Sequence, residues 1–268
     1  MSLEKIRKLT VAAISTYDLI KAGDRVMVAV SGGKDSAVML VVLDAIRKRA
    51  PYPFTLHPVL LDQKQPGFAV DAFREWVATQ GYELTVLEED TYSIVLDKTD
   101  EGKSYCGLCS RLRRGILYNH ADKMGYQKIA LGHHRDDLNT TLLMNLFFNG
   151  RIASMPPKLK SDDGRNVVIR PLAFVPEDDI KAASSALKVP IIPCNLCSSN
   201  GNMQRARIKK LIKDMETEHP HMALSLLKSQ QNIRASQLLD KSHWAFEKLE
   251  DCELSGSFAE EESSILSV

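Results

Sequence analysis

Long hydrophobic runs are missing from the 268-residue sequence, and no stretch approaches the roughly 20 apolar residues that a membrane-spanning helix needs. The first residues, MSLEKIRKL, are charged and amphipathic and lack the apolar centre of a secretory signal. Internal repeats are also missing, while 44% of the residues are hydrophobic and 26% are charged, a balance typical of a packed globular chain. We therefore expect a soluble, cytoplasmic protein that has no membrane partner.

Cysteine is scarce, and its count is odd. Four of the five cysteines form two Cys-x-x-Cys pairs, at 106/109 and 194/197, and the fifth is Cys252. An odd number of cysteines in a chain without a secretory signal argues against a disulfide framework. Each pair brings two sulfurs close enough to share a metal ion or a cluster. A four-cysteine structural zinc site is the simplest alternative, and a redox dithiol is disfavoured because neither pair lies in a thioredoxin-like position.

The net charge is only +1, but it is unevenly distributed. Residues 235–268 hold two basic and eight acidic side chains, so the first 234 residues carry a net charge of +7. A basic body is compatible with a polyanionic partner, and an ordinary solvated surface explains the same charge.

Strand and helix patterns alternate along the chain. Strands are predicted at 25–30, 54–61, 82–87, 128–131 and 167–172, and helices at 3–22, 37–48, 70–79, 112–124, 138–148 and 178–187. This order predicts an α/β fold with a doubly wound parallel sheet, which binds ligands at the carboxyl ends of its strands.

Three segments are expected along the chain. Residues 1–197 form the sheet domain with its preceding N-terminal helix, including a polar surface loop at 150–166. Residues 198–234 form a basic helical extension that packs on the sheet domain. Residues 235–268 form an acidic tail that is partly disordered, mainly from about residue 250 onward.

The first strand leads into Ser31, Gly32, Gly33, Lys34, Asp35 and Ser36, and then into a helix. A strand, a glycine turn and a helix N-terminus together make an anion site, because backbone N–H groups and the helix dipole point at the ligand. The serines add hydroxyl donors, Lys34 adds charge, and Asp35 offers a ligand for Mg²⁺. The loop is neither a Walker A motif nor a Rossmann fingerprint.

This SGGKDS segment resembles the pyrophosphate loop (PP-loop) of the N-type ATP pyrophosphatase superfamily, whose fold is adenine nucleotide alpha hydrolase-like. The resemblance implies that ATP is split between its α and β phosphates. AMP is transferred to an oxygen and then displaced by a nucleophile.

Six segments in order resemble the tRNA 2-thiocytidine biosynthesis family, the TtcA family. They are SGGKDS, CGLCSRLRRGILY, ALGHHRDD, MPPKLKSDDG, VIRPLAF and IIPCNLC, and they run from about residue 25 to residue 210. The resemblance implies a [4Fe–4S] cluster held by three thiolates, of which Cys106 and Cys109 match the first two. The third matches Cys197, with Cys194 as the competing choice, and Cys252 matches no family position.

The family's reaction would be the ATP-dependent adenylation of the C2 oxygen of cytidine 32 in tRNA, followed by its replacement with sulfur. The implied partners are tRNA and a sulfur donor such as a cysteine desulfurase, and a homodimer is compatible with the sequence. Two rivals stay open at this point. One is a related PP-loop enzyme that thiolates a uridine, and the other is a zinc-stabilised RNA-binding module with a vestigial ATP loop.

Further candidate residues lie after the strands and in basic clusters. Asp136 and Asp137 follow the fourth strand and are candidates for Mg²⁺ binding or proton transfer, with helix N-capping as the alternative. The neighbouring His133 and His134 are expected to pack or to bind RNA. Asp62 ends the second strand and is expected near the nucleoside of ATP. The candidate RNA contacts are basic residues in three clusters, with a solvated surface as the alternative for any single one. The clusters are Arg111, Arg113 and Arg114; Lys158, Lys160, Arg165 and Arg170; and Arg205, Arg207, Lys209, Lys210 and Lys213.

Overall fold

The computed structural model describes residues 3–99, 105–161, 163–193 and 201–249. Its contacts divide the chain into two compact units, residues 1–227 and 228–268. The domain boundaries expected at residues 197 and 234 stay predictions. Among the described residues, no helix has the length and apolarity needed to cross a bilayer.

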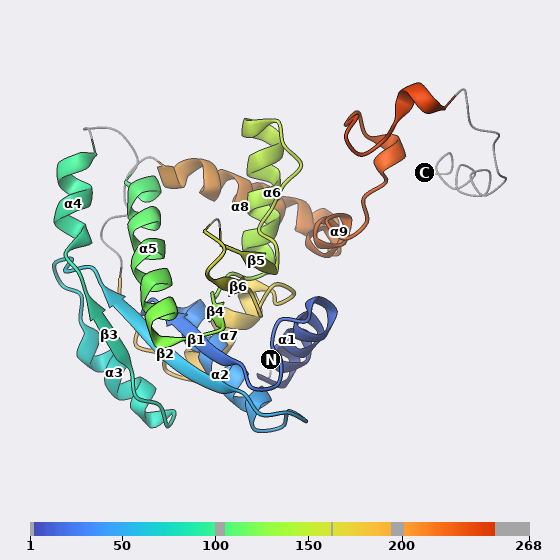
Figure 1. Ribbon diagram of the computed structural model, residues 1–268. Coiled ribbons are helices and arrows are strands. Elements are labelled where there is room, and N and C mark those ends of the chain that lie inside the picture. The colour runs from blue at the N-terminus through green and yellow to red at the C-terminus, as the bar shows by residue number, and fades with distance from the viewer. Residues whose placement is uncertain (1–2, 100–104, 162, 194–200, 250–268) are drawn as a thin grey trace. The chain divides into compact units, whose positions relative to one another are not determined.

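The first unit alternates strands and helices, as Figure 1 shows. Its strands are β1 (Arg25–Val30), β2 (Thr55–Asp62), β3 (Thr85–Glu88), β4 (Lys128–Ala130), β5 (Lys158–Lys160) and β6 (Val167–Ile169). Its helices are α1 (Leu3–Tyr17), α2 (Lys34–Arg47), α3 (Val70–Thr79), α4 (Thr91–Lys98), α5 (Cys106–Met124), α6 (Arg135–Asn149), α7 (Glu177–Ala186) and α8 (Gly201–Glu218). Helix α9 (Met222–Ser229) crosses the boundary, and the second unit has two described 3₁₀ turns, η2 (Ala235–Gln237) and η3 (Phe246–Lys248).

The six strands form one sheet in the order β3-β2-β1-β4-β6-β5. All neighbouring pairs are parallel except β5 with β6. The predicted doubly wound parallel sheet is therefore confirmed, with one antiparallel strand added at its edge. That strand corrects the surface loop expected at 150–166, because three residues there are enough to pair with β6 although they show no strand pattern.

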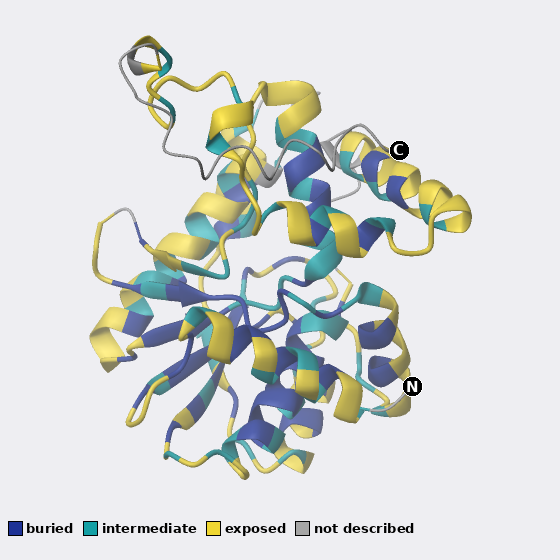
Figure 2. Ribbon diagram, turned by 90° about the vertical axis from the view of Figure 1, so that its right-hand side faces the viewer, coloured by how far each residue is buried: buried dark blue, intermediate teal, exposed yellow. Residues whose placement is uncertain are grey.

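Helices cover both faces of the sheet, so alternate side chains of each strand enter two different cores. Val26 and Val28 of β1 pack in the core formed with α1, α2, α3 and α7, whereas Met27 packs with Leu117 and Ala121 of α5. Figure 2 shows the buried residues concentrated in the sheet and on the helix faces turned toward it. Burial on both faces explains why the strands are almost entirely apolar.

Several element ends differ from the sequence-based expectation. Helix α1 stops at Tyr17, because Asp18 takes a φ of +48°, although buried Leu19 and Ile20 continue the apolar pattern. Helix α5 begins at Cys106, six residues before the predicted start at Leu112. Helix α4 was not predicted at all. Apolar periodicity misplaces such ends because it reports burial rather than backbone conformation.

Helix α8 packs on α6 of the sheet domain. Ile208 and Ile212 of α8 bury their side chains with Leu143 of α6 and Ala223 of α9. Asn139 of α6 donates a hydrogen bond to the Ala223 carbonyl at 2.7 Å. Helix α8 is therefore held on α6, whose first turn lies at the carboxyl edge of the sheet.

Candidate functional site

The strand order reverses between β1 and β4, so the loops that follow these two strands diverge at one edge of the sheet. Ligands of doubly wound sheets bind at such a switch point. The two loops are in close contact, because a Cβ added to Gly132 would lie 2.9 Å from the Ser36 backbone nitrogen. This contact places the segments 31–36 and 132–137 in one site.

The loop after β1 has the geometry of an anion site. Gly32 has a φ of +73°, and a Cβ there would lie 2.8 Å from Ile192, so both its conformation and its surroundings require glycine. The Ser31 N–H donates to Ser36 Oγ at 3.1 Å, and the two serine hydroxyls lie 3.3 Å apart. Because α2 begins at Lys34, its first N–H groups and the positive end of its dipole point toward this loop.

Lys34 is held between two carboxylates at this edge. Its Nζ lies 2.9 Å from Asp35 Oδ1 and 3.1 Å from Glu177 Oε1. Burial lowers the pKa of Lys34, but the hydrogen bonds and charges of Asp35 and Glu177 raise it above its ordinary value. Lys34 is therefore a stable cation beside the glycine loop.

The loop after β4 carries a buried histidine between carboxylates. His134 Nε2 lies 3.3 Å from Asp137 Oδ2 and 3.7 Å from Asp35 Oδ1. Asp137 also completes a capping box at the start of α6, because its side chain accepts the His134 backbone N–H. Asp136 accepts the Glu177 backbone N–H at 2.7 Å and pairs with Arg135 at 3.0 Å. The predicted capping alternative is thus present for both aspartates.

Helix α8 reaches this site through two cations. Arg205 pairs with Asp137 at 2.7 Å, and Lys209 lies 3.4 Å from Glu177. Burial raises the pKa of Glu177, but Lys209 and Lys34 outweigh it and hold that pKa at about 2. Burial also raises the pKa of Asp137, but the charges of His134 and Arg205 have the larger combined effect and bring that pKa below its ordinary value. Both carboxylates are therefore ionised, and both join α8 to the sheet edge.

His133 is the second histidine of this loop. Burial, together with the charge of Arg170, lowers the pKa of His133 to about 4. Its Nδ1 atom is buried without a hydrogen-bond partner among the described residues. A neutral imidazole thus lies within the site at physiological pH.

The loop after β2 connects the site to the first cysteine pair. Asp62 Oδ1 accepts the Lys64 backbone N–H at 2.7 Å, which turns the chain directly after the strand. Gln63 is buried and donates from Nε2 to Thr91 Oγ1 at 2.8 Å and to Cys109 Sγ at 3.3 Å. The Cys109 thiol therefore lies beside the carboxyl end of β2.

The same loop also contacts the segment that leads into the second cysteine pair. Gln65 Nε2 donates to the Pro193 carbonyl at 3.2 Å, and the Ile192 N–H donates to the Gly32 carbonyl at 2.9 Å. Residues 192 and 193 thus lie against both the glycine loop and the loop that reaches Cys109. In sequence, Cys194 follows directly.

The predicted cluster ligands are only partly described. Cys109 is buried and Cys106 begins α5, whereas Cys194, Cys197 and Cys252 lie outside the described residues. Within the described part of the chain, no three His, Cys, Asp or Glu side chains are grouped as metal ligands.

The predicted RNA contacts on α5 and α8 differ in how far they are exposed. The first turns of α5 carry Arg111, Arg113 and Arg114, of which the outer two are exposed. On α8, Arg207 and Lys210 are exposed, and Lys210 pairs with Asp214 at 2.6 Å. Arg205 differs from them because it is bound to Asp137 within the site.

One site residue, Glu177, escaped the sequence analysis as a functional candidate, because it looks like an ordinary helix-surface charge. Lys209 was expected only among the phosphate-binding cations, and Gln63 only in a loop that covers the nucleoside, so their contacts with Glu177 and Cys109 were not foreseen. Gln63 directly follows Asp62, the predicted end of β2, and that position was the available signal.

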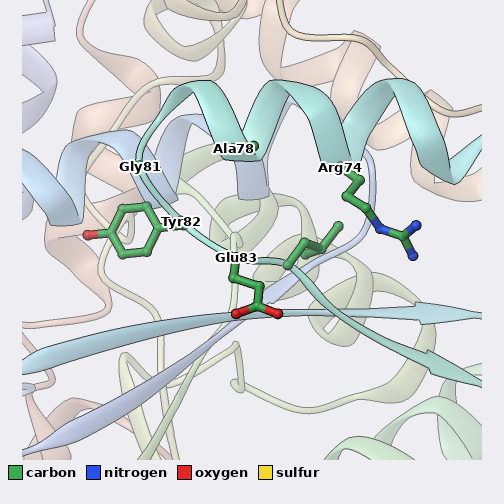
Figure 3. Close-up of a pocket in the computed structure, with 6 residues that line it drawn as sticks. Arg74, Ala78, Gly81, Tyr82 and Glu83 are labelled. Carbon is green, nitrogen blue, oxygen red and sulfur yellow. The ribbon is translucent and has the colours of Figure 1, made fainter.

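A separate hollow of about 560 Å³ lies between α3 and the turn leading to β3 (Figure 3). Its six described lining residues are Arg74, Ala78, Gly81, Tyr82, Glu83 and Leu84. The hollow lies before the start of β3, whereas the glycine loop follows the end of β1 in the same parallel sheet. It is therefore not part of the switch-point site.

The family model of the PP-loop domain matches residues 3–215 of the chain. This range includes the glycine loop, the β4 loop and most of α8. The chain therefore belongs to the PP-loop family.

Among its relatives are proteins named tRNA-cytidine(32) 2-sulfurtransferase. The one from Bdellovibrio bacteriovorus is 50% identical over 91% of this chain and 94% of its own length. The one from Pseudoalteromonas atlantica is 51% identical over 92% of this chain and 77% of its own length. Within the PP-loop family, the chain groups with these sulfurtransferases, which confirms the family predicted from the six motifs.

A solved structure has a similar fold. The U34-tRNA thiolase NcsA from Methanococcus maripaludis, solved with its [4Fe–4S] cluster, gives a TM-score of 0.67 at 22% identity. The match covers 87% of this chain and 80% of that protein. This likeness confirms the predicted fold class.

Proposed function

We propose that this protein is an ATP-dependent tRNA sulfurtransferase that converts cytidine 32 to 2-thiocytidine in the cytoplasm. The observation that carries the proposal is the 50% identity to a tRNA-cytidine(32) 2-sulfurtransferase over 91% of the chain. The complete SGGKDS loop at the switch point supports it, because a vestigial site would not need to keep these side chains together.

Nucleotide activation is assigned to the glycine loop. Its N–H groups, the hydroxyls of Ser31 and Ser36, and Lys34 bind the phosphates of ATP, while Asp62 lies toward the nucleoside. Asp35 would hold Mg²⁺, as a carboxylate at the phosphate edge can. The C2 oxygen of the base attacks the α-phosphorus, pyrophosphate leaves, and the base then carries AMP on that oxygen.

Sulfur insertion follows at the same base. Sulfide attacks C2 and forms the carbon–sulfur bond, and AMP leaves with the former C2 oxygen. A [4Fe–4S] cluster would be held by Cys106, Cys109 and Cys197, with Cys194 as the alternative third ligand. When bound, it would supply an iron with an open coordination position at which sulfide stays deprotonated. The neighbouring residues fit this placement, since Gln63 bonds Cys109 and Gln65 bonds Pro193, next to Cys194.

The base must leave the RNA stack to reach this edge, as enzymes that modify bases require. The basic residues of α5 and α8 are proposed to bind the tRNA phosphates. A cysteine desulfurase is the proposed source of sulfur, and a homodimer is compatible with the proposal.

The decisive test is mass spectrometry of tRNA nucleosides from a strain that lacks this gene. Expression of the wild-type chain should restore 2-thiocytidine, and Asp35→Ala or Cys109→Ala should not. Cys252→Ala is the matched control and should restore it fully. Restoration of a thiolated uridine instead would replace the proposed substrate. Stoichiometric zinc without iron in anaerobically purified protein would remove the cluster from the proposal.

Binding of tRNA is tested separately from chemistry. Arg207→Ala combined with Lys210→Ala should weaken binding of all tRNAs and lower the salt slope by about one per lost phosphate contact. The ATP affinity should be unchanged. If the tRNA affinity and the salt slope are unchanged, the RNA does not bind at α8, and Arg111, Arg113 and Arg114 are the next candidates.

A further inference from the structure

A buried amide lies against the one cysteine thiol whose surroundings the structure describes. Gln63 Nε2 is 3.3 Å from Cys109 Sγ, and the side chains of both residues are buried, with exposed fractions of 7% and 8%. The second N–H of the same amide points to Thr91 Oγ1 at 2.8 Å. The two donors of Gln63 are thus directed at one hydroxyl and one sulfur.

The backbone around Gln63 fixes this orientation. Asp62 Oδ1 accepts the Lys64 N–H on one side, and the Gln63 carbonyl accepts the Tyr92 N–H at 3.1 Å. Lys64 itself has a φ of +60°, which a non-glycine residue adopts only when its surroundings hold it there. Gln63 is therefore anchored at the end of β2 and at the start of α4, and its amide reaches Cys109 from a rigid base.

The remaining surroundings of Cys109 are apolar. Val95 is buried against Cys109 in a small hydrophobic core. Four partly buried side chains pack around this pair: Tyr92, Tyr105, Leu108 and Leu112. A neutral thiol needs no hydrogen-bond donor in such a pocket, because it is a small and nearly apolar group. A thiolate ligand has no proton and gains from any N–H directed at its sulfur. The Nε2–Sγ distance of 3.3 Å is shorter than the 3.9 Å at which a thiol would donate to the Gln63 Oε1 atom, so the closer amide group is the one that a thiolate ligand can use.

We propose that Gln63 is a positioning residue for the cluster: its amide N–H bonds the sulfur of Cys109 and raises the reduction potential. This inference rests on the proposed function, since it requires that Cys109 is a cluster ligand. Hydrogen bonds to ligand sulfurs are one of the determinants of iron–sulfur potentials, because they stabilise the extra negative charge of the reduced state. The bond also holds Cys109 in its rotamer before a cluster binds.

The test uses the anaerobically reconstituted full chain and three variants. Gln63→Leu removes the donor at similar volume, and Gln63→Glu removes it while the Thr91 hydroxyl can turn to donate to the new carboxylate. Gln127→Leu is the matched control, because it also removes the two bonds of a glutamine side chain, to Arg25 and Gly125, at the amino end of β1. The readouts are the midpoint potential and the iron–sulfur stretching bands in resonance Raman spectra.

We expect the potential to fall in Gln63→Leu, with the ratio of reduced to oxidised cluster at a fixed potential decreasing by up to roughly tenfold. A tenfold change corresponds to about 59 mV for one electron. The potential of Gln63→Glu should fall further, because the substitution adds a negative charge. The potential of Gln127→Leu should equal that of the wild type. The stretching bands should shift only in the Gln63 variants.

The failures of the two proposals are distinguishable. A wild-type chain that binds no iron overturns the cluster itself. A wild-type cluster whose potential and stretching bands are unchanged in both Gln63 variants overturns only the role of Gln63. If Gln63→Leu fails to fold, Gln63→Glu alone decides, since its size and its contact with Thr91 are retained.

Discussion

The loops after β1 and β4 leave neighbouring strands at the same edge, yet they are built from opposite chemistry. The β1 loop presents hydroxyls, backbone N–H groups and Lys34. The β4 loop presents two histidines and two carboxylates, and each carboxylate is already bonded to a helix. Asp136 caps α7, and Asp137 caps α6 and pairs with α8. One loop is arranged to bind an anion, and the other is arranged to hold three helices around it.

This difference separates the three aspartates that sequence analysis nominated for catalysis. Asp35 pairs with Lys34, a side chain that can turn to a phosphate when ATP binds. Asp136 and Asp137 accept hydrogen bonds from backbone N–H groups at helix starts, and Asp137 also pairs with Arg205 of α8. If they turned to a ligand, these contacts would break and the fold would lose stability. This difference favours Asp35 over Asp136 and Asp137 as the proposed Mg²⁺ ligand, and it indicates a structural role for the other two.

The largest expected effect comes from the contact between the two loops. A Cβ in Gly132→Ala would meet the backbone of Asp35 and Ser36 at 2.9–3.1 Å, so one loop must move. We expect a loss of about 3 kcal/mol in the free energy of unfolding and a loss of ATP binding. Urea denaturation and calorimetric titration with ATP measure the two effects.

Gly115→Ala is the control for that substitution. Gly115 lies within α5, where an added Cβ meets nothing within 4 Å, so alanine should stabilise the helix by up to about 1 kcal/mol. Equal stability of the two variants would mean that the loops are not interlocked.

The next effect concerns pH and the buried histidine of the β4 loop. The pKa of His133 is about 4 in the folded chain, against an ordinary value of 6.5. Between these values the unfolded chain binds a proton that the folded chain does not, so stability falls as pH decreases. The slope is about 1.4 kcal/mol per pH unit for one such group.

Above pH 6.5 histidine is neutral in both states, and this contribution is fully present. His133→Gln should reduce the loss between pH 6.5 and 4, measured as the free energy of unfolding in urea at several pH values, and the remaining loss is that of His57 and His120, whose pKa values burial also lowers. The pKa of Glu177 is about 2 in the folded chain, so Glu177 reduces the free energy of unfolding only when the pH falls below about 4.5. Identical pH profiles for the variant and the wild type would contradict the burial of a neutral His133.

A smaller effect tests whether the β4 carboxylates are structural. Asp136→Ala leaves the Glu177 N–H at the start of α7 without its acceptor and should cost about 2 kcal/mol in the free energy of unfolding. Asp178→Ala, in the same first turn of α7 but largely exposed, is the control and should cost less than about 0.5 kcal/mol. If Asp136→Ala keeps full stability yet abolishes ATP turnover, Asp136 belongs to catalysis instead.

The smallest effect compares two cations of α8. Arg205 pairs with a largely buried carboxylate, and its loss in Arg205→Ala should cost about 1 kcal/mol. The Lys210–Asp214 pair is solvent-exposed, so Lys210→Ala should change stability by less than about 0.5 kcal/mol. Thermal denaturation of both variants distinguishes a helix joined to the site from one that is merely near it.

The sequence predicted the strands and the β1 loop well because both depend on local signals. Buried parallel strands appear as short apolar runs, and glycines with serines between a strand and a helix leave few alternatives. The whole set from Ser31 to Ser36 was found in this way, and the structure places it at the switch point.

The contacts of the β4 loop were beyond sequence analysis because they join distant segments. Asp137 and Arg205 are 68 residues apart, and nothing in either local pattern pairs them. The same holds for Gln63 and Cys109, which are 46 residues apart. Capping by Asp136 was foreseen only as an alternative, and the helix that it caps is α7 rather than its own.

The contact between Ile192 and Gly32 also bears on the order in which the protein acquires its site during synthesis. The residue that packs on the glycine loop is separated from it by 160 positions, so the loop's final shape depends on a contact of very long range. Contacts of this kind form late, because a long loop of chain must close first. A nascent chain can therefore complete its first strands and helices on the ribosome, but its nucleotide site is finished only after residue 192 has emerged.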